Sequence, residues 1–404
     1  MIEEADWPHI VLLEPFNAGL AAARRMIALG ARVTIIVQPG HTLIARSRGV
    51  ESVVASFDPS GEPWLAALQQ LAGDSPEIVV LPASDRSSEF LVGAMPQLPG
   101  NVRAFEHPGS AHLKLMNKHE ADAIATRAGV PVPWTMPVSD GAQLAAAAAV
   151  APWPCVVKPV LSHEWRERYG QERVFLVADA DQAAALLERP LADGVPMLLM
   201  QYVPGGERQL EEATVVRLAD GSYPVRWGCR KLRQYPEGFG ATTVAESAFV
   251  PEAMDIAERV LDEAGFVGVA NVETKRHAQT GENWFLEVNV RLPGHWGLGE
   301  ACGAQCTQRL VAALLGRPLG PQPRLRAGVR VVFPELDRRV VGAELAAVPT
   351  WRRLALAWQL AQSYRNTREL GMFDPRDPGP GLAMAGDFTR RRIARLAARV
   401  KRAP

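Results

Sequence analysis

Two stretches of sequence, residues 271–276 (NVETKR) and residues 285–291 (FLEVNVR), form the strongest pattern in the chain. Each is typical of a β-strand, and the polar stretch HAQTGE between them indicates a turn. We therefore expect an antiparallel hairpin with an odd-numbered loop. A register centred on Thr280 would place Glu273 opposite Glu287 on one face of the sheet, whereas a slip of one residue would send them to opposite faces.

The polar residues of the second strand indicate a metal–phosphate site. Glu287, Asn289 and Arg291 are spaced two apart, so a strand places all three side chains on one face, with Glu273 on the neighbouring strand. Mg²⁺ is usually held by one or two carboxylates, with phosphate and water filling the other positions, and an arginine can bridge phosphoryl oxygens. The alternative is the solvent-facing side of an edge strand. It is disfavoured because Glu and Asn are poor strand formers that interrupt an apolar run.

A lysine follows a buried strand earlier in the chain. Lys158 comes directly after the apolar run PCVV and precedes a proline, which places its ammonium at the inner end of that strand. A buried ammonium needs an anionic partner, and a nucleotide phosphate is one. Taken alone, Lys158 could equally reach the surface along its apolar stem.

Composition limits the classes of protein that fit. The 404 residues include 44 Lys and Arg against 44 Asp and Glu, so no net charge attracts nucleic acid or an anionic membrane. No apolar run approaches the ~20 residues of a membrane span, and the acidic N-terminus lacks the features of a signal peptide. The four cysteines show no zinc spacing and are expected to be small buried residues. We therefore expect a cytoplasmic globular protein of two or three domains with no nucleic-acid partner.

The first hundred residues alternate strands and helices. Residues 9–14, 32–37 and 78–81 are apolar runs and residues 18–29 are Ala-rich and helical, which predicts a parallel sheet with helices on both faces. The turn after the first strand, EPFNAG, lacks the glycines of GxGxxG, and this argues against NAD binding. Asp85 follows the third strand at the edge where such sheets bind ligands. It is either a substrate contact or an ordinary helix N-cap.

The end of the chain has a different pattern. After residue 320 we expect a largely helical region with a Trp-rich helix at residues 351–363 and a basic terminal helix. The terminal helix carries seven basic residues, and Ile393, Leu396 and Val400 form one apolar stripe. A basic amphipathic helix can bind an anionic surface, but three apolar side chains bury too little area for stable anchoring. We therefore expect the stripe to pack on the preceding domain, with no stable membrane association.

Six motifs follow one another within about residues 78–315: LMNKHEADAIATRAGVPVPWT, PCVVKP, LLMQYVPGGE, RKLRQYPEGFG, NVETKR and FLEVNVR. In this order they resemble the ATP-grasp ligases, and most of all the carboxylate–amine branch near D-aspartate ligases and carbamoyl-phosphate-synthetase-like chains. The resemblance implies an α/β and α+β protein of three parts. These are a Rossmann-like parallel α/β domain (1–106), an ATP-grasp domain of two α+β subdomains that clamp ATP (107–320, with the lid subdomain at about 126–203) and a helical extension (321–404).

The resemblance also assigns roles to single residues. The lysines would contact phosphates, the segment at residues 200–203 would contact adenine as a hinge, and Glu207 would bind ribose. The ATP-binding residues would be Lys118, Lys158, Met200, Gln201, Tyr202, Val203, Glu207 and Lys231. The metal ligands would be Glu273, Glu287 and Asn289, and the catalytic residues would be Arg291 and Lys231.

This sequence departs from the family pattern in three places. Gln201 replaces a frequent glutamate, and its side-chain oxygen can still accept from an adenine amino group. The familiar Asn-Pro-Arg is Asn-Val-Arg here, which keeps both functional side chains. The loop at residues 162–172 is charged and carries one glycine, unlike a glycine-rich lid, although Arg166 and Arg168 could reach phosphate. The candidate substrate-binding residues are Asp85, Arg233 and Arg166.

The reaction implied by the resemblance is the ATP-dependent joining of a small carboxylic acid to an amine, with amino acids or their derivatives as substrates. An acyl phosphate would form and the amine would displace phosphate, with Mg²⁺ as the cofactor, Mn²⁺ as an alternative ion, and a homodimer as the family-based expectation. Two other classes stay open, because a fold does not fix a function. They are a kinase that phosphorylates a hydroxyl group and a nucleotide-binding module without ligase activity.

Overall fold

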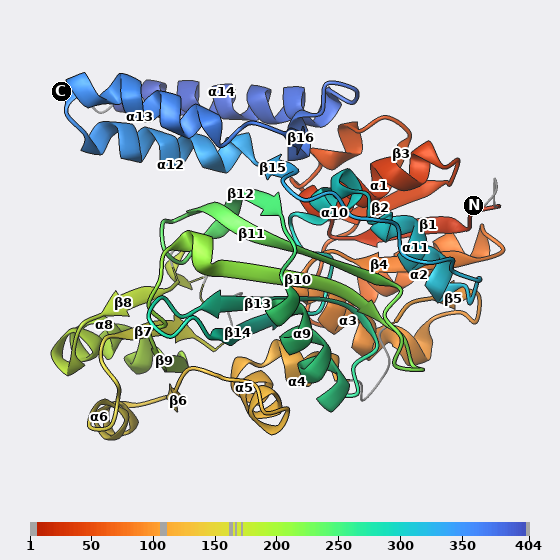
Figure 1. Ribbon diagram of the computed structural model, residues 1–404. Helices are drawn as coiled ribbons and strands as arrows, with labels where there is room; N and C mark the ends of the chain where they lie inside the picture. Colours follow the sequence, from red (N-terminus) through yellow and green to blue (C-terminus); the bar gives the residue numbers. More distant parts are fainter. Residues whose placement is uncertain (1–5, 106–110, 161–164, 166–167, 171–172, 401–404) are drawn as a thin grey trace.

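The computed structural model describes residues 6–105, 111–160, 165, 168–170 and 173–400, and for residues 391–400 it describes the backbone alone. The strands form one parallel sheet of five strands and two further sheets, and helices pack against all three (Figure 1). The predicted combination of α/β and α+β architecture is confirmed. Within the described residues, no helix is long and apolar enough to cross a membrane.

The N-terminal domain is a parallel sheet with strand order β3-β2-β1-β4-β5. Ile10 and Leu12 face the core that contains α1, while Val11 and Leu13 face the core that contains α2 and α3. Because both faces are covered, the central strands are continuous apolar runs, as predicted. The elements are β1 (His9–Leu13), α1 (Asn17–Ala28), β2 (Val33–Val37), η1 (Ile44–Arg46), β3 (Val50–Val54), α2 (Glu62–Gly73), β4 (Ile78–Pro82), α3 (Asp85–Ala94), η2 (Met95–Gln97) and β5 (Val102–Arg103).

Two short helices lead from this domain into a small antiparallel sheet with strand order β6-β9-β7-β8, which we call the lid sheet. Its core includes Leu144 of α6 and Leu187 of α8, so these two helices cover one face of the sheet. The elements are α4 (His112–Met116), α5 (Lys118–Arg127), β6 (Thr135–Val138), α6 (Gly141–Ala148), β7 (Cys155–Pro159), β8 (Phe175–Val177), α8 (Ala180–Ala192) and β9 (Met197–Gln201).

The third sheet has seven strands in the order β14-β13-β10-β11-β12-β15-β16 and lies between two helical layers. Helix α9 packs on one face, and α10 and α11 pack on the other face, where they also meet α1 of the N-terminal domain. The elements are η3 (Glu207–Gln209), β10 (Leu210–Arg217), β11 (Val225–Tyr235), β12 (Ala241–Ser247), α9 (Pro251–Glu263), β13 (Gly268–Arg276), β14 (Asn283–Asn289), α10 (Trp296–Cys302) and α11 (Cys306–Leu314).

The C-terminal region adds two strands to this sheet and three helices above it (Figure 1). Because β15 pairs with β12, the boundary predicted at residue 320 cuts a continuous sheet. The Trp-rich helix is present as α13, and α14 is the terminal helix. The predicted docking of its stripe (Ile393, Leu396, Val400) lies outside the described side chains. The elements are β15 (Arg330–Val332), α12 (Pro334–Ala347), α13 (Thr350–Gln362), β16 (Thr367–Glu369), η4 (Gly371–Phe373) and α14 (Gly379–Val400).

The hairpin of β13 and β14 has the predicted pairing of Glu273 with Glu287 but not the predicted loop length. The strands are antiparallel, and Glu273 pairs with Glu287 as expected. The register then shifts, because Thr274 pairs with Phe285 and Leu286 is left as an extra residue. The pair Arg276 and Asn283 consequently closes a loop with an even number of residues, so the predicted odd-numbered loop was wrong.

Candidate active site

A cleft lies between the lid sheet and the edge of the seven-stranded sheet formed by β13 and β14. Its cavity volume is about 120 Å³. Strands β7 and β9 form one wall, β11, β13 and β14 form the floor, and the first residue of α5 reaches the cleft. The predicted site residues that line it are Lys118, Lys158, Met200, Gln201, Tyr202, Val203, Lys231, Glu273 and Glu287.

The floor of the cleft holds a buried lysine among carboxylates. Lys231 Nζ lies 2.6 Å from Glu273 Oε2 and 3.5 Å from Glu212 Oε1. Burial raises the pKa of Glu273 to about 7 even though Lys231 opposes it, and the neighbouring carboxylates Glu212 and Glu287 add to the rise. The floor therefore carries more negative than positive charge, a balance that an additional cation would relieve.

Two lysines and an arginine meet the Glu287 carboxylate from the other side of the cleft. Burial alone would disfavour the Glu287 carboxylate, but Lys118 and Lys158 overcome this penalty and lower its pKa to about 2. Desolvation in turn lowers the pKa of Lys118 to about 8, against the attraction of Glu287, and the nearby positive charges of Lys158 and Arg173 act in the same direction. Several cations thus converge on one wall, which suits a polyanionic ligand.

The predicted hinge runs along the end of β9 and is held by backbone bonds to its neighbours. Gln201 donates its backbone N–H to the Trp134 carbonyl (2.7 Å), and the Trp134 N–H donates to the Gln201 side-chain oxygen (3.3 Å). The expected contact of that oxygen with an adenine amino group stays a prediction, because an amide oxygen can accept a second hydrogen bond. Tyr202 packs edge-on against Phe239 with ring centres 6.4 Å apart, which gives this end of the cleft an aromatic wall.

Two lining cations were missed by the sequence interpretation. Arg173 lies just beyond the charged loop and shares the cleft with Lys118. Lys275 is buried, and its Nζ lies 4.6 Å from the centre of the Tyr202 ring. Desolvation lowers the pKa of Lys275 to about 8, against the attraction of Glu273. The spacing of two between Glu273 and Lys275 is the signal that could have placed Lys275 on the cleft face.

Arg291 joins the cleft to the N-terminal domain. Its Nε donates to Asp85 Oδ1 (2.7 Å) and its Nη2 donates to Asn289 Oδ1 (3.0 Å), while Asn289 Nδ2 lies 3.5 Å from Glu287 Oε1. Asn289 therefore links the arginine to the carboxylate Glu287. The N-cap of α3 is Ser84 and not Asp85, so the Asp85 side chain is available to hold the arginine.

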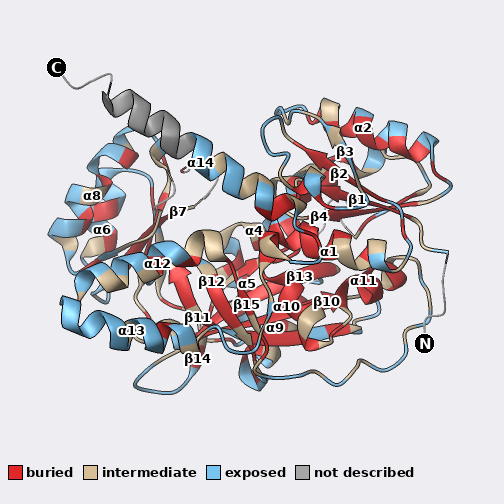
Figure 2. Ribbon diagram, turned by 90° about the horizontal axis from the view of Figure 1, so that it is seen from above, coloured by how far each residue is buried: buried red, intermediate tan, exposed pale blue. Residues whose placement is uncertain are grey.

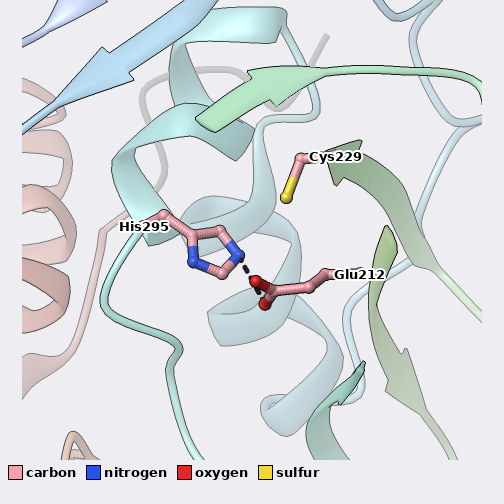
Figure 3. Close-up of side chains that lie close together, drawn as sticks. All are labelled: Glu212, Cys229 and His295. Atoms are coloured by element: carbon pink, nitrogen blue, oxygen red, sulfur yellow. Dashed lines mark ion pairs between the residues drawn. The ribbon is translucent and has the colours of Figure 1, made fainter. Parts of the chain in front are cut away.

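Three buried side chains, Glu212, Cys229 and His295, lie close together (Figure 3), and Glu212 contacts Lys231. His295 points its ring at the Glu212 carboxylate, with Nε2 3.3 Å from Oε2, and the Cys229 side chain lies above the same carboxylate. Asn271 also donates to Glu212 (2.6 Å). Because Glu212 is fixed by these neighbours and contacts Lys231, these side chains hold the lysine at the floor of the cleft. All four cysteines are free and buried, as predicted.

Comparison with known proteins identifies the fold. No family model and no curated protein matches the sequence. An N5-carboxyaminoimidazole ribonucleotide synthetase with bound ADP matches with a TM-score of 0.61, 19% identity, and coverage of 79% of this chain and 80% of that chain. Biotin carboxylase from Campylobacter jejuni matches with a TM-score of 0.59, 15% identity, and coverage of 80% and 74%. An L-amino acid ligase from Bacillus licheniformis matches with a TM-score of 0.57, 16% identity, and coverage of 76% and 74%.

This chain has the ATP-grasp fold. The lid sheet and the seven-stranded sheet are the two α+β parts of that fold, and the cleft described above lies between them. Glu207 of η3 does not line the cleft. Its side chain accepts a hydrogen bond (3.3 Å) from the N–H of Gly238, and Gly238 does line the cleft. The predicted ribose contact of Glu207 stays a prediction.

The predicted substrate contacts have different outcomes. Arg233 lies on β11 but does not line the cleft, and its guanidinium is bound by Asp337 of α12 (2.6 and 2.8 Å), so the structure gives no support to a substrate contact there. Arg166 lies outside the described residues. Arg168 donates to the Asp193 carbonyl (3.2 Å) at the end of α8, and its phosphate contact stays a prediction.

Proposed function

We propose that this ATP-grasp chain is an ATP-dependent carboxylate–amine ligase that forms an amide bond through an acyl phosphate. The observation that carries the proposal is the pairing of Glu273 with Glu287 across β13 and β14, at a cleft where Lys118, Lys158 and Lys231 converge. A carboxylate pair surrounded by cations suits a nucleotide triphosphate and its metal ion.

The carboxylates on the floor fit a divalent cation. Glu273 and Glu287 supply hard oxygen ligands, and the raised pKa of Glu273, caused by burial and the adjacent carboxylates, marks a local shortage of positive charge. Mg²⁺, with Mn²⁺ as the alternative, would be held by these two residues and would neutralise charge that develops on the phosphates. Asn289 is the third candidate ligand, although its side-chain oxygen accepts from Arg291 in this structure.

The chain's own groups would contribute to two successive steps. Lys118, Lys158 and Arg173 bind the phosphate oxygens, and an oxygen of the substrate carboxylate attacks the γ-phosphorus while ADP departs. The amine then attacks the carbonyl carbon, and phosphate leaves with the former carboxylate oxygen. Arg291, positioned by Asp85 and Asn289, stabilises the negative charge that develops in both steps.

The two ends of the cleft suit different parts of the substrates, with adenine at one end and the acid and the amine at the other. The Tyr202 and Phe239 rings offer an apolar surface for adenine, beside the backbone of the hinge. At the other end, Asp85 lies at the carboxyl edge of the parallel sheet, where such sheets bind ligands. We therefore place the acid and the amine between Arg291 and the N-terminal domain, with small amino acids or their derivatives as the substrate class.

The test is a panel of carboxylic acids and amines, supplied singly and in pairs with ATP and Mg²⁺. A ligase releases phosphate only when a matching acid and amine are both present, and it forms the amide in equal amount. Phosphorylation of a hydroxyl compound with no free phosphate would identify a kinase instead. Binding of ATP without any turnover across the panel would leave a nucleotide-binding module and would contradict the proposal.

A further inference from the structure

Helix α13 exposes a row of large apolar side chains. Trp351, Leu354 and Trp358, which we call the outer stripe, are 74%, 85% and 71% exposed. Their spacing of three and four residues places them on one face of the helix. Figure 2 shows most of α13 as exposed, and Leu360 is its one buried residue. A helix with this composition and so little buried surface is expected to have a partner on its open face.

The charge of the surrounding segment limits what that partner can be. Residues 349–404 contain twelve basic and four acidic residues, a net charge of +8, and the neutral chain therefore carries −8 over residues 1–348. Arg352 and Arg353 follow the first tryptophan of the outer stripe directly, and the Arg352 guanidinium lies 4.6 Å from the Trp351 ring. An occupant of the outer stripe meets this positive charge, so a negatively charged surface is favoured.

The same charge argues against a second copy of the chain on this face. A two-fold interface brings identical surfaces together, so the arginines beside the outer stripe, Arg352 and Arg353, would face their counterparts in the second copy. The whole-chain neutrality does not remove this effect, because charges separated by more than about 8–10 Å are screened at physiological salt. The local charge of the helical region therefore decides what approaches it.

We propose that the outer stripe and the basic residues around it dock this protein on the surface of a membrane that contains anionic lipids. Tryptophan is the side chain that prefers the lipid–water boundary, and arginine beside it pairs with lipid phosphates. The interpretation of the sequence counted only the three apolar residues of the terminal helix. The structure shows a different set of apolar side chains, the outer stripe of α13, which that interpretation did not consider. The contact is peripheral, with the helical region against the membrane and the acidic part of the chain away from it.

The test is co-sedimentation of the full-length chain with two kinds of vesicle, phosphatidylcholine alone and phosphatidylcholine mixed with phosphatidylglycerol. We expect binding to the mixed vesicles, weaker binding as salt is raised, and little binding to phosphatidylcholine alone. The triple variant W351S/L354S/W358S should bind about tenfold more weakly or not at all. Its thermal midpoint should stay close to that of the wild type, because the three side chains are exposed.

The matched control is Phe249→Ser, which removes an equally exposed aromatic residue (83%) from the loop before α9 and should leave vesicle binding unchanged. Failure of the wild type to bind the mixed vesicles would overturn the proposal. So would a dimer in sedimentation velocity that becomes a monomer in the triple variant, because the stripe would then be covered by a second copy. Equal loss of binding in the control and the triple variant would also overturn it.

Discussion

Two clusters of charged and polar side chains meet at strand β11, and they differ in how completely their charges are paired. The cleft cluster consists of Lys231, Glu212, Glu273 and Glu287, and the arm cluster consists of Arg233, Asp337, Thr243 and Tyr364. In the arm cluster Asp337 accepts from Arg233 at 2.6 and 2.8 Å and from Thr243 at 2.8 Å, and Tyr364 also donates to it. One buried acid meets one buried cation there, with hydroxyl donors completing the set.

The cleft cluster is not balanced in this way. Two carboxylates, Glu212 and Glu273, share Lys231 at the floor of the cleft, and Glu212 Oε1 accepts no hydrogen bond from the described residues. Burial of charge is therefore common to a structural anchor and to a candidate active site. The candidate active site differs from the anchor because its floor has more carboxylates than cations and faces a cleft. That excess of negative charge is what allows it to take up a ligand.

The largest effect is expected from substitutions at the cleft, which should abolish most of the activity and leave the fold intact. Glu287→Gln and Arg291→Ala should each lower kcat by some hundreds-fold, on the order of 3–4 kcal/mol, because both groups act on charge that forms in the transition state. Steady-state turnover measures the loss, and thermal unfolding verifies that the variants stay folded. More than about a tenth of wild-type kcat in either variant would remove that residue from the chemistry.

The arm cluster should show the reverse behaviour. Asp337→Asn leaves the buried Arg233 guanidinium without its counter-charge and should cost about 3 kcal/mol of the free energy of unfolding. Denaturant unfolding measures this loss, and kcat of the folded variant should stay close to the wild-type value. Thr243→Val is the control within the cluster, because it removes one neutral donor and should cost less. A large fall in kcat with unchanged stability in Asp337→Asn would erase the distinction between the two clusters.

The sequence predicted the cleft cluster better than the arm cluster for a physical reason. A spacing of two in a strand places residues on one face, and this rule brought Glu273 opposite Glu287. The same rule would put Lys231 and Arg233 on one face, but the register of β11 shifts between them, so Leu232 interrupts the alternation. A bulge of this kind depends on the neighbouring strand and leaves no mark in the sequence of one strand.

Contacts between distant segments were also beyond the reach of spacing rules. Asp337 is 104 residues from Arg233, and no local pattern connects α12 with β11. Arg173 is a single cation in a loop, where periodicity carries no information. The parallel sheet, strand β9 and the hairpin of β13 and β14 were predictable, since each depends on a local run of residues or on an ordered set of motifs.

The smallest of these effects concerns pH. Because desolvation lowers the pKa of Lys118 to about 8, its ammonium is lost as pH rises through that value, and phosphate binding should weaken. We expect kcat/KM for ATP to fall by up to about tenfold between about pH 7 and about pH 9. Lys118→Arg keeps its charge over this range and should remove much of the fall, with a remainder from Lys275, whose pKa is also about 8. Identical pH profiles for the wild type and Lys118→Arg would contradict the assignment of Lys118 to the phosphates.

The central claim is that the cleft cluster serves transfer of a phosphoryl group from ATP to a carboxylate. The most direct measurement uses an acid substrate labelled with ¹⁸O in its carboxylate, with ATP, Mg²⁺ and the amine, and follows the label by mass spectrometry. An acyl-phosphate path transfers one labelled oxygen from the acid to the released phosphate, and the amide keeps the other. Release of unlabelled phosphate, with both labelled oxygens outside it, would contradict the account.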